Sequence, residues 1–429
     1  MTTEIAILNH QAVALAADSA ATVGLPAGSQ KIYTSANKIF GLSRRHPVAV
    51  MIYNAGAFMG VPWETVVKLY RDHLADSSSP TVAAYLADFI SYLPTQPAFC
   101  TPEGQQAWFE GLVRAELEGG RDALRVAVEQ ALTKTGADGI DEGELSILAA
   151  NLFGQRLDHL RSADLIDPAW GPGDFETANR VGVIEILQDV FGGLPLTDEA
   201  KDILVTVVSE FITRQHESNA FSGVVAAGFG HDEIFPSLWE RVVDGVIDGH
   251  LRSWPRTSHV VAVEGAAIVP FAQDDMVRAF VEGVSPSYQS AIEALISRVI
   301  SGYPEALLGA TTGLSAKVRT SIEAAHATIG PQASQLALEQ LAEWRSEKFV
   351  TELIEIVSVL PKEELASLAE ALVNLTSLRR RMSRQAETVG GPVDVAVISK
   401  GDGLIWMKRK HYFEPGLNPQ YMANRYGSL

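Results

Sequence analysis

The apolar pattern of the chain begins within its first ten residues. Ile5 and Ile7 alternate with Glu4, Ala6 and Leu8, and residues 12–17 are apolar throughout, with a polar segment over residues 9–11 between them. An alternating segment and a short apolar run are both typical of β-strands, and polar residues between them are typical of a turn. The pattern therefore predicts a β-hairpin over residues 3–18.

The same pattern predicts a second pair of strands and then a change to helices. Residues 38–42 and 48–53 are apolar segments separated by a polar break. After Gly60 the apolar residues recur at helical spacing, over residues 61–74 and 81–93. The strand pair is therefore expected to lead directly into two helices.

Strand and helix patterns continue to alternate in blocks along the rest of the chain. We expect helices over most of 95–218, near Asp274, over 286–345 and over 362–385, and strands in 222–230, 237–251, 259–273 and 390–413. Asp402-Gly403 is a strong hairpin signal within the last of these. This order predicts an α+β fold whose sheet core (residues 1–94, 219–285 and 346–429) is enlarged by two helical insertions (95–218 and 286–345).

Composition and charge narrow the class of function. The 429 residues carry a net charge of -18, which disfavours nucleic acid or an anionic membrane as the main partner. Cys100 is the single cysteine, which excludes an internal disulfide, and we expect a cytoplasmic protein. The sequence has neither an HExxH motif nor a P-loop, so we expect no metal and no cofactor.

Three blocks of sequence resemble the N-terminal-nucleophile hydrolases, and most closely the proteasome β subunit and the peptidase of the bacterial HslVU protease. They are "TTEIAILNHQAVALAADSAATVG", "NKIFGLSRRHPVAVMIYNAG" and "VGGPVDVAVISKGDG". With "SGVVAAGFG" and "AIVPFAQDDMVRAFVEG" the resemblance covers about half of the chain, and the helical insertions lie outside it. It implies a four-layer α-β-β-α sandwich and a mature N-terminal threonine.

The resemblance implies a nucleophile at Thr2, exposed when Met1 is removed. A free α-amine on the same residue is a suitable base for its hydroxyl, since the unperturbed pKa of such an amine is ~7.7–8.0. Asp18 follows Thr2 at the spacing of the family's acidic partner, and Thr3 is one position short. The plainer interpretation of Thr2 is the chance start of an edge strand.

The family's acid pairs with a lysine, and two lysines compete for that role. Lys38 is followed by two apolar residues and leads into the next strand, as in the family, so we prefer it. Lys31 also precedes an apolar pair and remains an alternative. Thr22 matches the family's substrate-binding threonine, and Asn54 stands where the family has a glycine whose N–H stabilises the oxyanion.

The sequence departs from the family pattern at two places that support proton transfer. Phe271 occupies the position of a serine, and Ala386 or Glu387 stands where the family has a supporting aspartate. Val389 likewise replaces a usual serine. These changes remove proton-relay groups but leave the nucleophile, amine and lysine in place.

These observations predict a threonine-type hydrolase that cleaves peptide or other amide bonds. Two alternatives remain: a catalytically inactive assembly or scaffold protein of the same fold, and an amidase for a small molecule, since one fold hosts many functions. The resemblance also implies a homo-oligomer and leaves room for a separate ATPase or regulator. The insertions could then form a lid, an oligomer contact or a docking surface.

Overall fold

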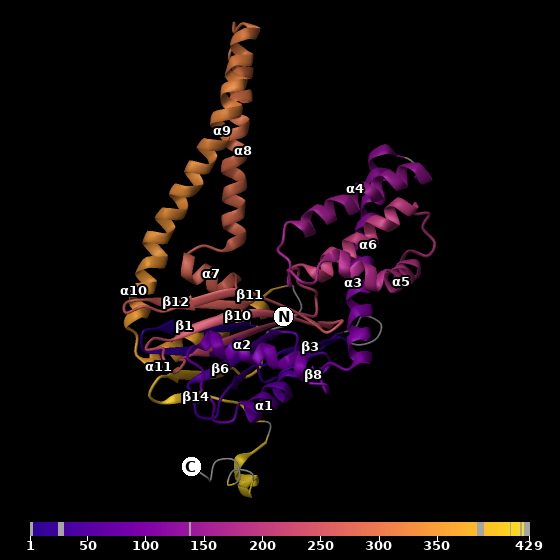
Figure 1. Cartoon of the computed structure of the whole chain (residues 1–429). Helices are drawn as coiled ribbons and strands as arrows, with labels where there is room; N and C mark the ends of the chain where they lie inside the picture. Colours follow the sequence, from indigo (N-terminus) through magenta and orange to yellow (C-terminus); the bar gives the residue numbers. More distant parts are fainter. Residues whose placement is uncertain are drawn as a thin grey trace. The chain divides into compact units, whose positions relative to one another are not determined.

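The computed structural model describes residues 3–24, 30–136, 139–383, 390–411, 413–420 and 423. The protein is a mixed α+β fold with several antiparallel sheets (Figure 1). The residues form two compact units, each of which makes most of its contacts within itself. The first contains residues 1–39, 232–237 and 259–429, and the second contains residues 40–231 and 238–258. The predicted division into a core and two insertions stays a prediction.

The first unit is built on a five-stranded antiparallel sheet of order β12-β1-β2-β13-β14. Its strands are β1 (Thr3–Asn9), β2 (Ala12–Ala17), β12 (Ala266–Ala272), β13 (Asp394–Ser399) and β14 (Gly403–Lys408). The predicted first hairpin is confirmed, and Asn9 closes its turn by accepting from the N–H groups of Gln11 and Ala12. The predicted turn at Asp402-Gly403 is confirmed as well, with Gly403 at a φ of 75°.

Three helices cover one face of this sheet: α7 (Asp275–Glu282), α10 (Glu352–Val359) and α11 (Lys362–Arg381). The alternation of the strands turns Ile5, Ile7, Ala14 and Ala16 toward these helices, where they pack on a core that includes Leu365. The predicted amphipathic helix near the C-terminus is confirmed as α11.

The first unit also contains a long helical hairpin, formed by α8 (Pro286–Ala310) and α9 (Ala316–Arg345). The predicted helical segment 286–345 is therefore confirmed, and helical structure continues through a π-helical turn (Ser346–Thr351) into α10. A short hairpin of β3 (Ala21–Gly24) and β4 (Gln30–Tyr33), which the sequence pattern did not predict, follows β2.

The second unit contains a five-stranded sheet of order β11-β10-β9-β6-β5. Its strands are β5 (Ile39–Gly41), β6 (Val48–Asn54), β9 (Ser222–Gly228), β10 (Ser237–Ile247) and β11 (His250–Val260). Helices α1 (Trp63–Leu74) and α2 (Val82–Tyr92) pack on it through a shared apolar core, and a small ribbon of β7 (Ala57–Phe58) and β8 (Val61–Pro62) precedes them. The predicted strand pair and both helices are confirmed.

The rest of the second unit is a bundle of four helices with its own core. They are α3 (Pro102–Thr135), α4 (Glu142–Arg161), α5 (Pro172–Phe191) and α6 (Asp198–Thr213). Thr101, Asp141 and Thr197 cap three of these helices with their side-chain oxygens. The predicted helical character of residues 95–218 is thus confirmed. None of the helices in the described part of the chain has a stretch long and apolar enough to cross a membrane.

A candidate active site around Asp18 and Lys38

Asp18 lies just beyond the end of β2, where three backbone N–H groups converge on its carboxylate. Oδ1 accepts from Thr3 N at 3.1 Å, and Oδ2 accepts from Ala20 N at 3.2 Å and from Gly390 N at 2.9 Å. The residue is only 1% exposed. Hydrogen bonds of this kind replace the water contacts that a carboxylate loses on burial and fix its orientation.

Lys38 is buried beside this carboxylate and also contacts a second one. Its Nζ forms an ion pair with Asp18 Oδ1, and it lies 3.1 Å from Oε1 of Glu4, a fully buried residue. A buried ammonium loses its hydration, so it is stable only where carboxylates of this kind compensate it. The three side chains therefore form one buried ionic cluster.

The first hairpin fixes the geometry of this cluster. Glu4 pairs with Ala17 across β1 and β2, and the N–H of Asp18 donates to the carbonyl of Thr3 at 3.1 Å. Adjacent residues of one strand point to opposite faces, so register alone determines which side chains can meet. The register of β1 and β2 thus brings Asp18 beside the backbone of Thr3.

The Gly390-Gly391 segment lies against the same turn. The N–H of Ser19 donates to the carbonyl of Gly390 at 3.2 Å, while Gly390 N donates to Asp18. Gly391 has a φ of +84°, and a Cβ on it would come within 2.8 Å of Thr34 Cβ. Both the conformation and the close approach require glycine at position 391. The glycine pair thus allows this segment to lie close enough for Gly390 N to reach Asp18.

The structure separates the two candidate lysines. Lys38 contacts Asp18, whereas Lys31 is exposed on β4 with its Nζ 5.2 Å from the centroid of the Tyr33 ring. A partner for the buried carboxylate must itself be buried beside it, and Lys38 meets that condition. A catalytic role for Lys38 stays a prediction.

The remaining predicted residues of this region are placed only in part. Thr2 lies outside the described residues, and its neighbour Thr3 is buried in β1 opposite Ala272. Thr22 lies on β3 opposite Ile32, and its side chain is outside what the structure describes. The substrate-binding role of Thr22 stays a prediction.

Asn54 ends β6 in the second unit with a φ of 66°, in the left-handed region that favours glycine. Its exposed side chain donates to the carbonyl of Phe221 at 2.7 Å. This conformation agrees with the glycine that the resemblance implies at this position. The proposed oxyanion role of its backbone stays a prediction.

The departures from the family pattern fall partly within the described residues. Phe271 is 4% exposed on β12 and pairs with Glu4 across the sheet. The position expected for a serine is therefore occupied by a buried aromatic ring. Ala386, Glu387 and Val389 lie outside the described residues.

Sequence reasoning missed Glu4 as a member of the cluster and gave Gly390 no role in it. A signal for Glu4 was available, because it is the one charged residue in the apolar strand 3–9, and a fully buried strand has no solvent face for it. For Gly390 the only signal in the sequence was that it belongs to the pair Gly390-Gly391.

The second unit carries a different polar cluster around Tyr53, Glu240 and Arg256. Tyr53 Oη donates to Glu240, and Arg256 donates to Tyr53 Oη at 3.0 Å and pairs with Glu217 at 2.9 Å. Burial and the nearby Glu240 carboxylate raise the pKa of Tyr53, and burial raises the pKa of Glu217. These groups satisfy one another, so we assign the cluster a structural role.

The chain shows neither a metal-binding cluster in its described part nor a match to known protein families. Among the described residues, no group of three or more His, Cys, Asp or Glu side chains is arranged to hold a metal ion. A scan against models of known protein families gave no match, and neither did a search of curated proteins.

Proposed function

We propose that this protein is a threonine-type hydrolase of peptide or other amide bonds, with Thr2 as the nucleophile after removal of Met1. One observation carries the proposal: Lys38 and Asp18 form a buried ion pair, and the N–H of Thr3 donates to the same carboxylate. The pair is thus attached to the backbone directly after Thr2. Buried ionic pairs are not needed for stability and are frequent at functional sites, so a pair at this point of the chain supports a catalytic role beside Thr2.

The proposed reaction proceeds by acyl transfer. The Oγ of Thr2 attacks the carbonyl carbon, and the free α-amine of Thr2 accepts the hydroxyl proton and passes it to the leaving nitrogen. The C–N bond breaks and an ester to Thr2 forms. Water then attacks the ester with the amine as base, which releases the acid and restores the hydroxyl.

In this mechanism Lys38 and Asp18 act on Thr2 without bonding to substrate. The ammonium of Lys38 favours the deprotonated forms of the neighbouring amine and hydroxyl, because a nearby positive charge lowers their proton affinity. Asp18 holds that ammonium in place and is itself held by the N–H groups of Thr3, Ala20 and Gly390. Glu4 adds a second carboxylate contact to Lys38.

The proposal includes the four-layer α-β-β-α sandwich of the family and a homo-oligomer, both of which follow from the resemblance. The buried Phe271 favours one alternative, an inactive protein that keeps the fold for assembly. An aromatic ring cannot relay a proton, so this residue separates the two functions in a testable way.

The test is intact mass of the purified protein before and after treatment with a peptide epoxyketone. This reagent needs both the hydroxyl and the free amine of an N-terminal threonine. We expect the native chain to start at Thr2 and to gain one inhibitor mass. The Thr2→Ala variant should gain none, and Lys38→Met should react at least about tenfold more slowly, which corresponds to about 1.4 kcal/mol.

Lys31→Met is the matched control, because Lys31 is exposed and away from Asp18. It should react like the native protein. A chain that retains Met1 would contradict the proposal, since the amine would then be blocked. A chain that begins at Thr2 but forms no adduct would favour the inactive alternative, and Phe271→Ser would be the next variant.

A further inference from the structure

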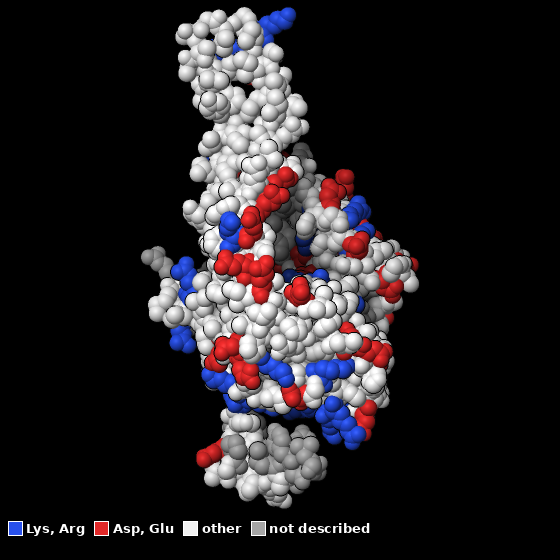
Figure 2. Space-filling model, turned by 90° about the vertical axis from the view of Figure 1, so that its left-hand side faces the viewer, with Lys and Arg blue, Asp and Glu red and all other residues white. Residues whose placement is uncertain are grey.

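The α8–α9 hairpin exposes an unusual amount of apolar surface for a helical pair. Among its residues only Leu308 and Gly330 are fully buried, while Tyr288, Tyr303 and Ile329 are 60%, 64% and 59% exposed. Figure 2 shows few charged side chains on the face of the hairpin that is turned to the viewer. A surface of this kind normally contacts a partner.

Most of the exposed large apolar residues form one stripe on each helix. The stripe on α8 contains Tyr288, Leu295, Val299 and Tyr303, and the stripe on α9 contains Val318, Ile329 and Leu336. Leu307 on α8 and Leu341 and Trp344 on α9 are exposed as well. On α8 the later members follow Tyr288 by 7, 11 and 15 residues, and on α9 they follow Val318 by 11 and 18 residues. Each spacing is close to a whole number of helical turns, so the members of each stripe share one helix face.

Both stripes lie on the same side of the hairpin. The helices face each other near Ile300, whose carbonyl accepts from the ring of His326 at 2.9 Å, and near the buried Gly330. Val299 precedes Ile300 and Ile329 precedes Gly330 by one residue, which is about 100° of rotation in each helix. Because the two helices are antiparallel, equal rotations turn both stripes to one side.

We propose that this apolar face, made of the seven stripe residues, binds the same face of a second copy of the chain. The exposed fractions of these side chains correspond to roughly 700 Å², close to the ~800 Å² per partner of a standard interface. A twofold pair buries identical patches against each other, so one apolar face suffices.

Charge selects an antiparallel arrangement of the two hairpins. The charged residues nearest the tip are Lys317 and Arg319, and those near the base of α9 are Glu339, Glu343 and Arg345, of which Arg345 is paired with Glu282. The antiparallel arrangement brings the basic tip of one copy to the acidic base of the other. A parallel arrangement would instead bring the two tips together.

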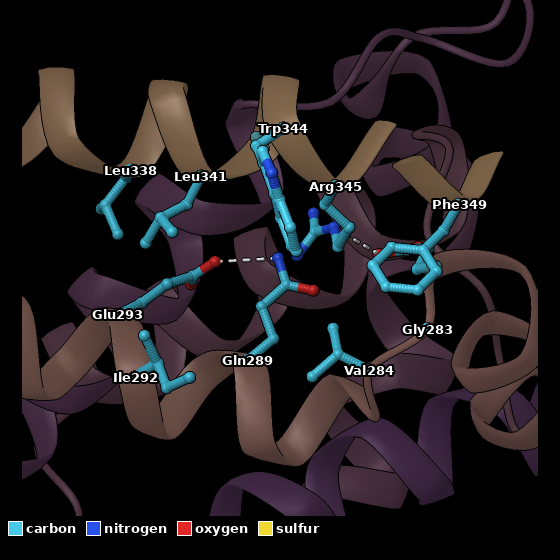
Figure 3. A pocket seen from close by; sticks show the side chains of 12 residues that line it. Gly283, Val284, Gln289, Ile292, Glu293, Leu338, Leu341, Trp344, Arg345 and Phe349 are labelled. Atoms are coloured by element: carbon cyan, nitrogen blue, oxygen red, sulfur yellow. Dashed lines mark hydrogen bonds and ion pairs between the residues drawn. The ribbon is translucent and has the colours of Figure 1, made fainter. Parts of the chain in front are cut away.

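A groove at the base of the hairpin provides a place for the tip of the second copy. It has a volume of about 280 Å³ and is lined mainly by apolar groups, among them Ile292, Leu338, Trp344 and Phe349 (Figure 3). Val318 and Trp344 are 26 residues apart on α9, about 39 Å at 1.5 Å per residue. A twofold axis midway between them, close to Ile329, would fill both grooves at once.

The first test is the mass of the full chain in solution by analytical ultracentrifugation. We expect Ile329→Glu to halve the mass of the native assembly. Val181→Glu is the matched control, because Val181 is 73% exposed on α5 of the other unit, and it should leave the mass unchanged. A monomeric native protein, or an assembly that Ile329→Glu leaves intact, would overturn the proposal.

The second test is disulfide cross-linking, which the single buried Cys100 leaves free of background. A mixture of Val318→Cys and Trp344→Cys chains should form a covalent dimer on oxidation, and neither variant should do so alone. Efficient cross-linking of Val318→Cys to itself would contradict the antiparallel arrangement. Neither test depends on Thr2, and the epoxyketone test does not depend on assembly, so the hydrolase reaction and this interface can fail separately.

Discussion

Lys38 Nζ lies 3.1 Å from Glu4 Oε1, and both side chains are buried. The same ammonium contacts Asp18, so two carboxylates from one hairpin share one positive charge. Removing a single partner of a buried ionic cluster leaves the others in a medium that solvates them poorly. Lys38 is therefore the residue on which the cluster depends.

The Lys38→Met variant should be strongly destabilised. Methionine keeps the length of the side chain but leaves both carboxylates without this ammonium, at an expected cost of about 3–5 kcal/mol in the free energy of unfolding. Lys31→Met, on the exposed β4 surface, should change it by less than about 0.5 kcal/mol. Urea denaturation of both variants measures the difference. Equal stabilities would show that the Lys38 ion pair is absent in solution.

The Gly391→Ala variant should weaken the segment that lies against Asp18. A Cβ at this position would come 2.8 Å from Thr34 Cβ on a backbone with a φ of +84°. We expect a loss of about 2 kcal/mol, read as a shift in the urea midpoint. Gly401→Ala is the control, because no atom lies within 4 Å of its added Cβ, and it should change stability by less than about 1 kcal/mol. Similar losses in both variants would contradict this geometry.

The two candidate lysines show how much of this site the sequence could predict. Both precede apolar pairs, so local pattern left Lys31 and Lys38 open. Their difference is burial, which depends on the fold around Asp18 and on a glycine segment more than 370 residues away in the chain. Long-range packing of this kind leaves no periodic signal in the sequence.

The strands and helices were predictable for a different reason. Helical spacing in 61–74 reports directly which face of that helix is buried, and the structure confirms it. Residues 3–9 are buried on both faces of their strand, so their apolar content marked this element. The β3–β4 hairpin was missed because it is short and β4 is exposed, so it carries no apolar pattern. The α8–α9 segment was predicted as helix, but its sequence alone did not show which apolar side chains the hairpin leaves exposed.

Cys100 should resist thiol reagents in the folded protein. Burial raises the pKa of its thiol to about 11, and Sγ lies 3.7 Å from the carbonyl of Leu93. Since the thiolate is the reactive form, Ellman's reagent at about pH 8 should react with less than about one tenth of the native chains within an hour. Full reaction in denaturant is the control. Rapid reaction of the native protein would mean that this part of the second unit opens readily.

Acid should destabilise the helical bundle through Glu210. Burial opposes ionisation of this carboxylate, but hydrogen bonds from Arg214 and Arg161 outweigh it, so the pKa of Glu210 is below its ordinary value of 4.5. A lowered folded-state pKa adds stability above about pH 4.5 that is lost as the pH falls through the lowered value. Melting temperatures across this range should fall more steeply for the native protein than for Glu210→Gln. Glu199→Gln, at an exposed site on α6, should follow the native curve.

Substitutions at Asn54 test whether the end of β6 has the conformation that the resemblance implies. At a φ of 66°, Asn54→Gly relieves the steric cost of a side chain and loses one exposed hydrogen bond to Phe221, so stability should change by less than about 1 kcal/mol. Asn54→Val should cost about 1–2 kcal/mol more, because a β-branched residue is strained in this region. Thermal unfolding of the pair measures this difference directly. Equal tolerance of glycine and valine would mean that this residue is extended in solution, and the match to the family's glycine would then lose its structural basis.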